Sequence, residues 1–312
     1  MSSARTPKPN LFIVGAMKCG TTAWYEYLRS HPDIFMSARK EPSYFAFDVP
    51  HWRHVKTEEE YSALFAGSGA AKVIGEASTT YLFSKTAAKA LRDYSPSAKI
   101  LIFLRDQEEY LPSLHNQFLA EFSEDIIDFE TAWKLSGRRP PGTIPPACVE
   151  PRTLDYAAMG RFDEQVQRYF DAFPPDQIRL FWFRDWVEDP RSTYREILSF
   201  LGLDDDGRAD FQPANKGITL RFRGLLRHLD DPPPAARKVA RLFKRITGLK
   251  PAMQKSLVQK SVKLLTAAGY EGISPGLRDE IRSYYAEGNR RLDGLMASAS
   301  SVSRLCLERA LT

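Results

Sequence analysis

Gly15-Ala16-Met17-Lys18-Cys19-Gly20-Thr21-Thr22 is the stretch that decides how this chain folds. An apolar run at 11–14 precedes it and a helical pattern near 20–30 follows it, which predicts a strand, a glycine loop and a helix. Such a loop presents backbone N–H groups and a helix N-terminus to an anion, and glycine allows close approach. The Lys18 ammonium and the Thr21 and Thr22 hydroxyls add donors. The loop is therefore expected to cradle a phosphate.

The order of residues within this loop distinguishes two kinds of phosphate chemistry. A nucleoside triphosphatase loop places lysine directly after its second glycine and a metal-binding hydroxyl after that lysine. Here Thr21 stands at the lysine position, and Lys18 lies inside the loop. A cation inside the loop can stabilise the charge that develops on a bridging oxygen when a sulfuryl group leaves a phosphosulfate. A P-loop nucleotide kinase stays open as the enzymatic alternative.

A second anion-binding pattern follows the strand-like run at 99–104. Arg105 ends this run, and Ser113 lies eight residues later in a helical pattern near 107–122. The forked guanidinium of arginine suits a phosphate, and a helix hydroxyl adds a donor. Because ligands of parallel α/β sheets bind at the carboxyl ends of strands, both patterns are expected to face one ligand.

Strand-like and helical patterns alternate along the first two thirds of the chain. The expected strands lie at 11–14, 72–75, 99–104 and 178–183. The expected helices lie near 20–30, 58–66, 86–94, 107–122, 161–173, 190–201, 235–247, 253–266 and 275–296. This alternation predicts an α/β fold of three layers, α/β/α and P-loop-like, with a mostly parallel central sheet and a helical C-terminal part. We expect one domain over 1–312, with a core at 10–203 and a helical extension at 204–312.

The loop at 15–22, followed by His31-Pro32 and by Lys40-Glu41-Pro42-Ser43-Tyr44-Phe45, resembles the sulfotransferase family that uses 3′-phosphoadenosine 5′-phosphosulfate (PAPS). The likeness is to its bacterial and heparan sulfate-type branch and extends over nearly the whole chain. In that family this loop holds the 5′-phosphosulfate, and an Arg and a Ser eight residues apart hold the 3′-phosphate. The resemblance therefore implies that PAPS is bound by Lys18, Cys19, Gly20, Thr21, Thr22, Arg105 and Ser113.

The resemblance also implies which residue takes the acceptor proton. A glutamate downstream of the phosphosulfate loop is the base in the heparan-type branch, and Glu41 matches it. Pro42 restricts the backbone beside Glu41, which helps to direct the carboxylate into a cleft. Glu76, in Gly75-Glu76-Ala77-Ser78, also resembles a family segment and is expected to orient Lys18 or to bind the acceptor. Weaker candidates for the base are His51, His54 and His115.

Two further segments are expected to border the ligands. Family members close a basic loop over the nucleotide, and the matching residues here are Lys216, Arg221 and Arg223. The long irregular segment at 123–159 is expected to shape the acceptor site, because long loops in compact domains are often binding loops. The arginines of this segment that suit an anionic glycan are Arg138, Arg139 and Arg152.

Charge is concentrated in one segment. Residues 221–263 contain 12 Lys or Arg and 2 Asp, a net charge of +10, whereas the whole chain carries +5. Such a block fits a polyanionic substrate, an acidic membrane surface or the solvated face of helices. A non-catalytic binder of polyanions that acts through 221–263 is the second alternative. We expect a possible peripheral membrane contact here and no nucleic acid partner.

Composition limits the location and the cofactors. The 312 residues are 43% hydrophobic, enough for a packed core, yet no apolar run is long enough to span a membrane. The first ten residues lack an apolar signal-peptide core, and Cys19, Cys148 and Cys306 are too far apart for a zinc site. We therefore expect a cytoplasmic protein with reduced thiols and no metal.

These inferences combine into one predicted function. The protein is expected to move a sulfuryl group from PAPS to a hydroxyl or amine of a glycan, a glycolipid or a small metabolite. The product of the donor is 3′-phosphoadenosine 5′-phosphate. Glu41 is expected to remove the acceptor proton, while Lys18 stabilises the leaving bridging oxygen.

Overall fold

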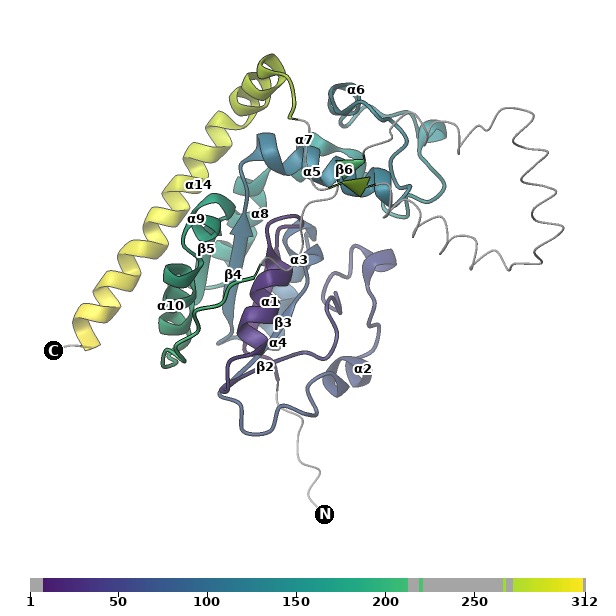
Figure 1. Ribbon diagram of the computed structural model, residues 1–312. Helices are drawn as coiled ribbons and strands as arrows, with labels where there is room; N and C mark the ends of the chain where they lie inside the picture. The colour runs from purple at the N-terminus through teal and green to yellow at the C-terminus, as the bar shows by residue number, and fades with distance from the viewer. Residues whose placement is uncertain (1–7, 213–218, 221–265, 268–271, 311–312) are drawn as a thin grey trace.

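The computed structural model describes residues 8–212, 219–220, 266–267 and 272–310. Its centre is a sheet of five parallel strands in the order β2-β3-β1-β4-β5 (Figure 1). The strands are β1 (Leu11–Gly15), β2 (Ile34–Met36), β3 (Val73–Ala77), β4 (Lys99–Leu104) and β5 (Ile178–Trp182). All residues of β1 and β3 are buried, which is why both read as continuous runs of apolar or small residues with a single charge, Glu76.

Helices cover both faces of this sheet and make the three layers. One face carries α1 (Thr21–Arg29), α9 (Phe183–Glu188) and α10 (Pro190–Leu201). Trp24 of α1 stacks on Phe103 of β4 with ring centroids 5.4 Å apart, which fixes α1 to this face. The opposite face carries α3 (Thr80–Phe83), α4 (Ala87–Tyr94) and α8 (Phe162–Ala172). The predicted α/β class with a mostly parallel sheet is therefore confirmed.

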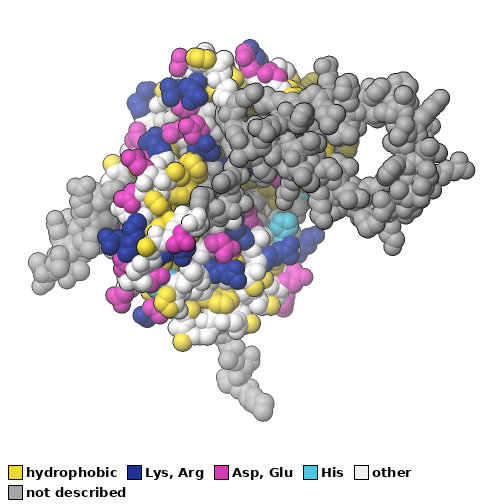
Figure 2. All heavy atoms as spheres, viewed as in Figure 1, with side chains coloured by type: hydrophobic (Ala, Val, Ile, Leu, Met, Phe, Trp, Pro, Cys, Tyr) yellow, Lys and Arg dark blue, Asp and Glu magenta, His cyan; other side chains and the backbone are white. Residues whose placement is uncertain are grey.

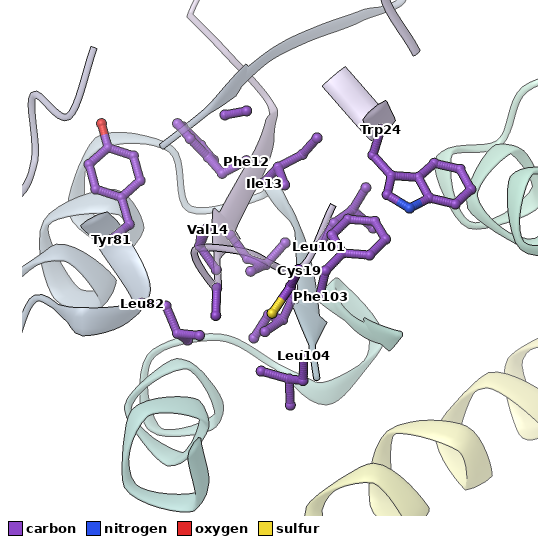
Figure 3. Close-up of a cluster of buried hydrophobic side chains, with 14 of the residues drawn as sticks. Phe12, Ile13, Val14, Cys19, Trp24, Tyr81, Leu82, Leu101, Phe103 and Leu104 are labelled. Carbon is purple, nitrogen blue, oxygen red and sulfur yellow. The ribbon is translucent and has the colours of Figure 1, made fainter. Parts of the chain in front are cut away.

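The main core lies around β1 and β4 (Figure 3). Val14 and Leu104 point toward Leu82 of α3, whereas Phe103 lies against the Trp24 indole on the other side of the sheet. Cys19 has no exposed surface, and its sulfur lies among these hydrophobic side chains. Cys19 thus anchors the loop at 15–22 to the hydrophobic core.

Two long helices complete the architecture. Helix α5 (Gln107–Ala120) follows β4 and contains Pro112 without ending there. Helix α14 (Pro275–Ala310) packs against α8 and α5. Its Arg291 pairs with Asp163 at 2.6 Å, and its Asn289 accepts a hydrogen bond from Gln107 at 2.8 Å. These contacts fasten the C-terminal helix to the sheet domain.

Short elements connect these layers. They are α2 (Glu58–Ala63), α6 (Phe129–Lys134), α7 (Tyr156–Met159), the 3-10 turns η1 (Pro50–Trp52), η2 (Pro141–Thr143), η3 (Pro151–Leu154) and η4 (Pro175–Gln177), and the antiparallel pair β6 (Thr219–Leu220) and β7 (Thr266–Ala267). Strand β2 was not predicted from the sequence. The predicted helices at 235–247 and 253–265 lie outside the described residues, and residue 266, expected at the end of a helix, belongs to β7.

Charged side chains of both signs are interspersed over the described surface that Figure 2 shows. The strongly basic segment at 221–263 lies outside the described residues. No helix in the part of the chain that the structure describes has the length and apolar character to cross a membrane.

Candidate active site

A cavity of about 1020 Å³ opens at the carboxyl edge of the sheet. The segment that follows each of the five strands contributes to its wall. Lys18 follows β1, Glu41 follows β2, Thr79 follows β3, Arg105 follows β4 and Trp186 follows β5. The chain winds outward in opposite directions from β1 and β4, so Lys18 and Arg105 flank the point at which parallel α/β sheets bind ligands.

The loop after β1 lines this cavity as the sequence predicted. Lys18, Gly20, Thr21 and Thr22 all lie on the wall, and the two threonines begin α1. Gly20 has a φ of +83°, and a Cβ at this position would overlap the Trp186 ring. Glycine is therefore required here by both the backbone conformation and the neighbouring indole.

Lys18 lies deep enough in the cavity for its surroundings to change its titration. Burial lowers the pKa of Lys18, and the nearby positive charge of Arg105 lowers it further. The carboxylate of Glu121 acts in the opposite direction. An anionic ligand between Lys18 and Arg105 would remove this repulsion between the two cations.

Arg105 and Ser113 lie on the same cavity wall as the loop. The Arg105 guanidinium donates to Glu109 Oε2 at 3.0 and 3.1 Å and sits 4.6 Å from the centroid of the Phe183 ring. Its side chain is 23% exposed, so it is held in place yet accessible. Ser113 faces the cavity from α5, one residue after Pro112. The structure thus brings both predicted anion sites into one cavity. Their roles in binding PAPS stay predictions.

Glu41 is fixed at the cavity wall by three hydrogen bonds. The Lys40 ammonium lies 2.9 Å from Oε1. Thr79 donates its backbone N–H and its hydroxyl to Oε2 at 2.9 and 2.7 Å. The carboxylate keeps 25% of its side-chain surface exposed. A carboxylate held this firmly and still open to the cavity has the placement that a general base needs.

Two predicted site residues have no side-chain surface in the cavity. Glu76 is fully buried, and its oxygens accept hydrogen bonds from Tyr61, Tyr81 and Ser78. The expected contact of Glu76 with an acceptor is therefore not supported. Cys19 is also fully buried, and burial raises the pKa of its thiol. The side chain of Cys19 is part of the core, so only its backbone N–H can contact an anion bound by the loop.

The segment at 123–159 reaches the cavity, but its arginines do not. Ser123, Cys148, Val149, Glu150 and Thr153 line the wall. The three arginines that suit an anionic glycan, Arg138, Arg139 and Arg152, do not line the cavity, and a role for them in acceptor binding stays a prediction. Arg139 pairs with Glu124 at 2.6 Å and with Asp125, Arg152 pairs with Glu150 at 2.7 Å and with Asp48, and Arg138 is absent from the lining residues.

Other lining residues were not anticipated or were ranked low. Glu121 directly follows α5 and lines the cavity, and burial by the surrounding protein raises the pKa of its carboxyl. His54 lines the wall, whereas His115 is buried and bonds the Ile126 carbonyl at 2.8 Å. No local motif marks Glu121, because its position depends on where α5 ends. The predicted contacts Lys216, Arg221 and Arg223 lie outside the described residues.

The sulfotransferase domain family matches residues 8–212 of this chain. The chain belongs to this family. Membership in this family favours sulfuryl transfer over the nucleotide kinase that the order of the loop residues left open.

Curated relatives and a solved structure agree with this assignment. Carbohydrate sulfotransferase 15 of Rattus norvegicus is 25% identical over 252 residues, which covers 62% of this chain and 44% of the relative. Heparan sulfate glucosamine 3-O-sulfotransferase 3B1 of Mus musculus is 26% identical over 196 residues, which covers 62% and 46%. The chain thus spans less than half the length of these two relatives. A sulfotransferase from Alicyclobacillus acidocaldarius shares the fold, with a TM-score of 0.67, 24% identity and coverage of 93% and 96%.

Proposed function

We propose that this chain is a sulfotransferase that uses PAPS as its donor and sulfates a hydroxyl or amine of a carbohydrate acceptor. The observation that carries the proposal is the single cavity that joins the Lys18 loop to Arg105 and Ser113. The family generally uses PAPS, and its relatives named above are carbohydrate and heparan sulfate enzymes. A donor with anionic groups at both ends requires two cationic sites on one surface, which this cavity provides.

The residues present fit such a donor. Gly20, Thr21 and Thr22 offer backbone and hydroxyl donors at a helix N-terminus, where a 5′-phosphate is favoured. Arg105 and Ser113 offer a guanidinium and a hydroxyl for the 3′-phosphate. Phe183 and Trp186 supply aromatic surface on the same side of the cavity. When bound, PAPS supplies an activated sulfuryl group on a phosphate leaving group.

Glu41 and Lys18 divide the work of the transfer. Glu41 accepts the proton of the acceptor hydroxyl or amine as the new bond to sulfur forms. The electron pair of the breaking sulfur–oxygen bond stays on the bridging oxygen, and Lys18 stabilises the charge there. Thr79 and Lys40 hold the Glu41 carboxylate in one orientation throughout.

Calorimetry tests the donor first. The purified chain is titrated with 3′-phosphoadenosine 5′-phosphate and with ATP, each with and without magnesium. We expect tight binding of the first in the absence of magnesium and weaker binding of ATP. Preferential binding of ATP would contradict the proposal. Transfer of labelled sulfate from PAPS to a panel of neutral and charged oligosaccharides then identifies the acceptor, with Glu41→Gln as the variant that binds donor without turnover.

A further inference from the structure

A buried hydrogen-bond network connects Glu76 to the segment that carries Glu41. Glu76 Oε1 accepts from the Tyr61 and Tyr81 hydroxyls, each at 2.7 Å, and Oε2 accepts from the Ser78 hydroxyl at 2.8 Å. None of these groups lines the cavity, and the mechanism above does not use them. Burying a carboxylate costs free energy, and hydrogen bonds offset only part of that cost. The presence of Glu76 at this position therefore needs an explanation.

The network has a fixed direction of hydrogen bonding. A hydroxyl has one proton, and Ser78 and Tyr81 both direct it to Glu76. Their oxygens are consequently left as acceptors. Ser78 Oγ accepts from the Ser43 backbone N–H at 2.9 Å, and Tyr81 Oη accepts from the Phe45 backbone N–H at 3.4 Å. The carboxylate thus determines that both hydroxyls receive hydrogen bonds from the 43–45 backbone.

This backbone is the continuation of the segment that presents Glu41. Ser43 has a φ of +53°, a region that L-residues rarely occupy and keep only when neighbouring contacts hold them there. Those contacts are the bond to Ser78 Oγ and the bond from Ser43 Oγ to Thr80 Oγ1 at 3.2 Å. Pro42 links Ser43 directly to Glu41. The orientation of Ser43 therefore limits where the Glu41 carboxylate lies.

We propose that Glu76 is a positioning residue that acts through Ser78 and Tyr81 to hold the Glu41 segment in its reactive placement. The inference rests on the proposed role of Glu41 as the base. Thr79 lies between Ser78 and Tyr81 in the sequence and donates two hydrogen bonds to Glu41 itself. The segment that follows β3 therefore supports the base directly through Thr79 and indirectly through Ser78 and Tyr81.

The protonation state of Glu76 should make turnover depend on pH. Burial raises the pKa of Glu76 to about 7, and the negative charge of Glu41 raises it as well, while the three hydroxyls oppose the rise. The other titratable groups that act electrostatically with Glu76 are Tyr61, Tyr81, Tyr94 and Tyr169. A proton on Glu76 converts an acceptor oxygen to a donor and breaks the direction of the network. Turnover should therefore fall as the pH falls through neutrality.

Two variants test the inference on the full chain. Glu76→Gln places an amide N–H₂ against at least one hydroxyl donor, and Ser78→Ala removes the bond to Ser43 N with little change in volume. Each is expected to lower kcat at least tenfold while the affinity for 3′-phosphoadenosine 5′-phosphate stays within twofold. Glu76→Gln is also expected to lose the fall in kcat near pH 7. Tyr169→Phe is the control, because its hydroxyl bonds the Tyr81 carbonyl and not Glu76.

The outcomes separate this inference from the proposed function. If the unaltered protein fails to bind 3′-phosphoadenosine 5′-phosphate, the proposed function is wrong. If the protein is active and Ser78→Ala and Glu76→Gln keep kcat within twofold, only the positioning role is overturned. The same holds if both variants lose nucleotide affinity in parallel with kcat, since that result indicates a general structural defect. Should Glu76→Gln not fold, Ser78→Ala alone decides.

Discussion

Thr79 donates its backbone N–H and its hydroxyl to the same oxygen of Glu41, at 2.9 and 2.7 Å. The two residues come from different segments, since Thr79 follows β3 and Glu41 follows β2. A pair of hydrogen bonds on Oε2 leaves Oε1 to Lys40 and orients the whole carboxylate. The placement of the base is thus set by the end of a neighbouring strand and not by its own segment alone.

Thr79→Val should lower turnover without weakening donor binding. The variant keeps the shape of the side chain and the backbone bond but removes the hydroxyl bond to the carboxylate. Loss of one hydrogen bond to a charged group is worth about 1.5–3 kcal/mol, so we expect kcat to fall by about one to two orders of magnitude. Steady-state kinetics with labelled PAPS measure this. Thr79→Ser restores the hydroxyl and should recover most of the rate; equal rates for the two variants would contradict the role.

Gly20→Ala should impair both stability and nucleotide binding. The new Cβ would overlap the Trp186 ring, and the φ of +83° is strained for alanine. We expect a loss of about 1–3 kcal/mol in unfolding free energy, measured by urea denaturation, and at least tenfold weaker binding of 3′-phosphoadenosine 5′-phosphate. Gly69→Ala is the matched control, because Gly69 also has a positive φ (+53°) but nothing within 4 Å of the added Cβ. A similar loss in both variants would show that backbone strain alone is responsible.

The parts of the site that could be predicted are those that depend on contiguous residues. A glycine loop after a buried strand, and Arg105 with Ser113 one helix segment later, place their groups through local geometry alone. The parallel order of β1 and β4 then brings the two together at one edge. For these residues, the carboxyl-end rule for parallel sheets was sufficient.

The acceptor side could not be predicted in the same way. Whether Arg139 and Arg152 are available depends on their ion-pair partners, and Asp48 lies 104 residues from Arg152. Whether Glu76 faces the cavity or the core depends on two tyrosines from separate helices. Strand β2, with only three residues, is too short for its periodicity to be recognised. In each case the sequence names the residue type, and only the tertiary contacts decide its role.

Arg105→Ala should remove the preference for a 3′-phosphate. We expect the affinity for 3′-phosphoadenosine 5′-phosphate to fall at least tenfold, toward that for adenosine 5′-monophosphate, because a guanidinium–phosphate contact is lost. Calorimetry with the two nucleotides gives the ratio. Arg184→Ala is the control, since Arg184 carries the same charge near the same edge but pairs with Asp106 at 2.7 Å and is not among the lining residues. An unchanged ratio in Arg105→Ala would place the 3′-phosphate elsewhere.

The pH dependence of stability should report the burial of Glu76 independently of activity. The ordinary pKa of this carboxyl is 4.5, and burial raises the pKa to about 7 in the folded protein. Between these values the fold keeps a proton that the unfolded chain has released. The free energy of unfolding of the unaltered protein should therefore fall as the pH rises from 4.5 to 7, relative to the non-titrating variant Glu76→Gln, and level off above that. At 1.36 kcal/mol per pKa unit the relative fall is about 3 kcal/mol. Urea denaturation of both proteins at several pH values measures the difference, and a difference that stays constant with pH would mean that Glu76 titrates normally in the fold.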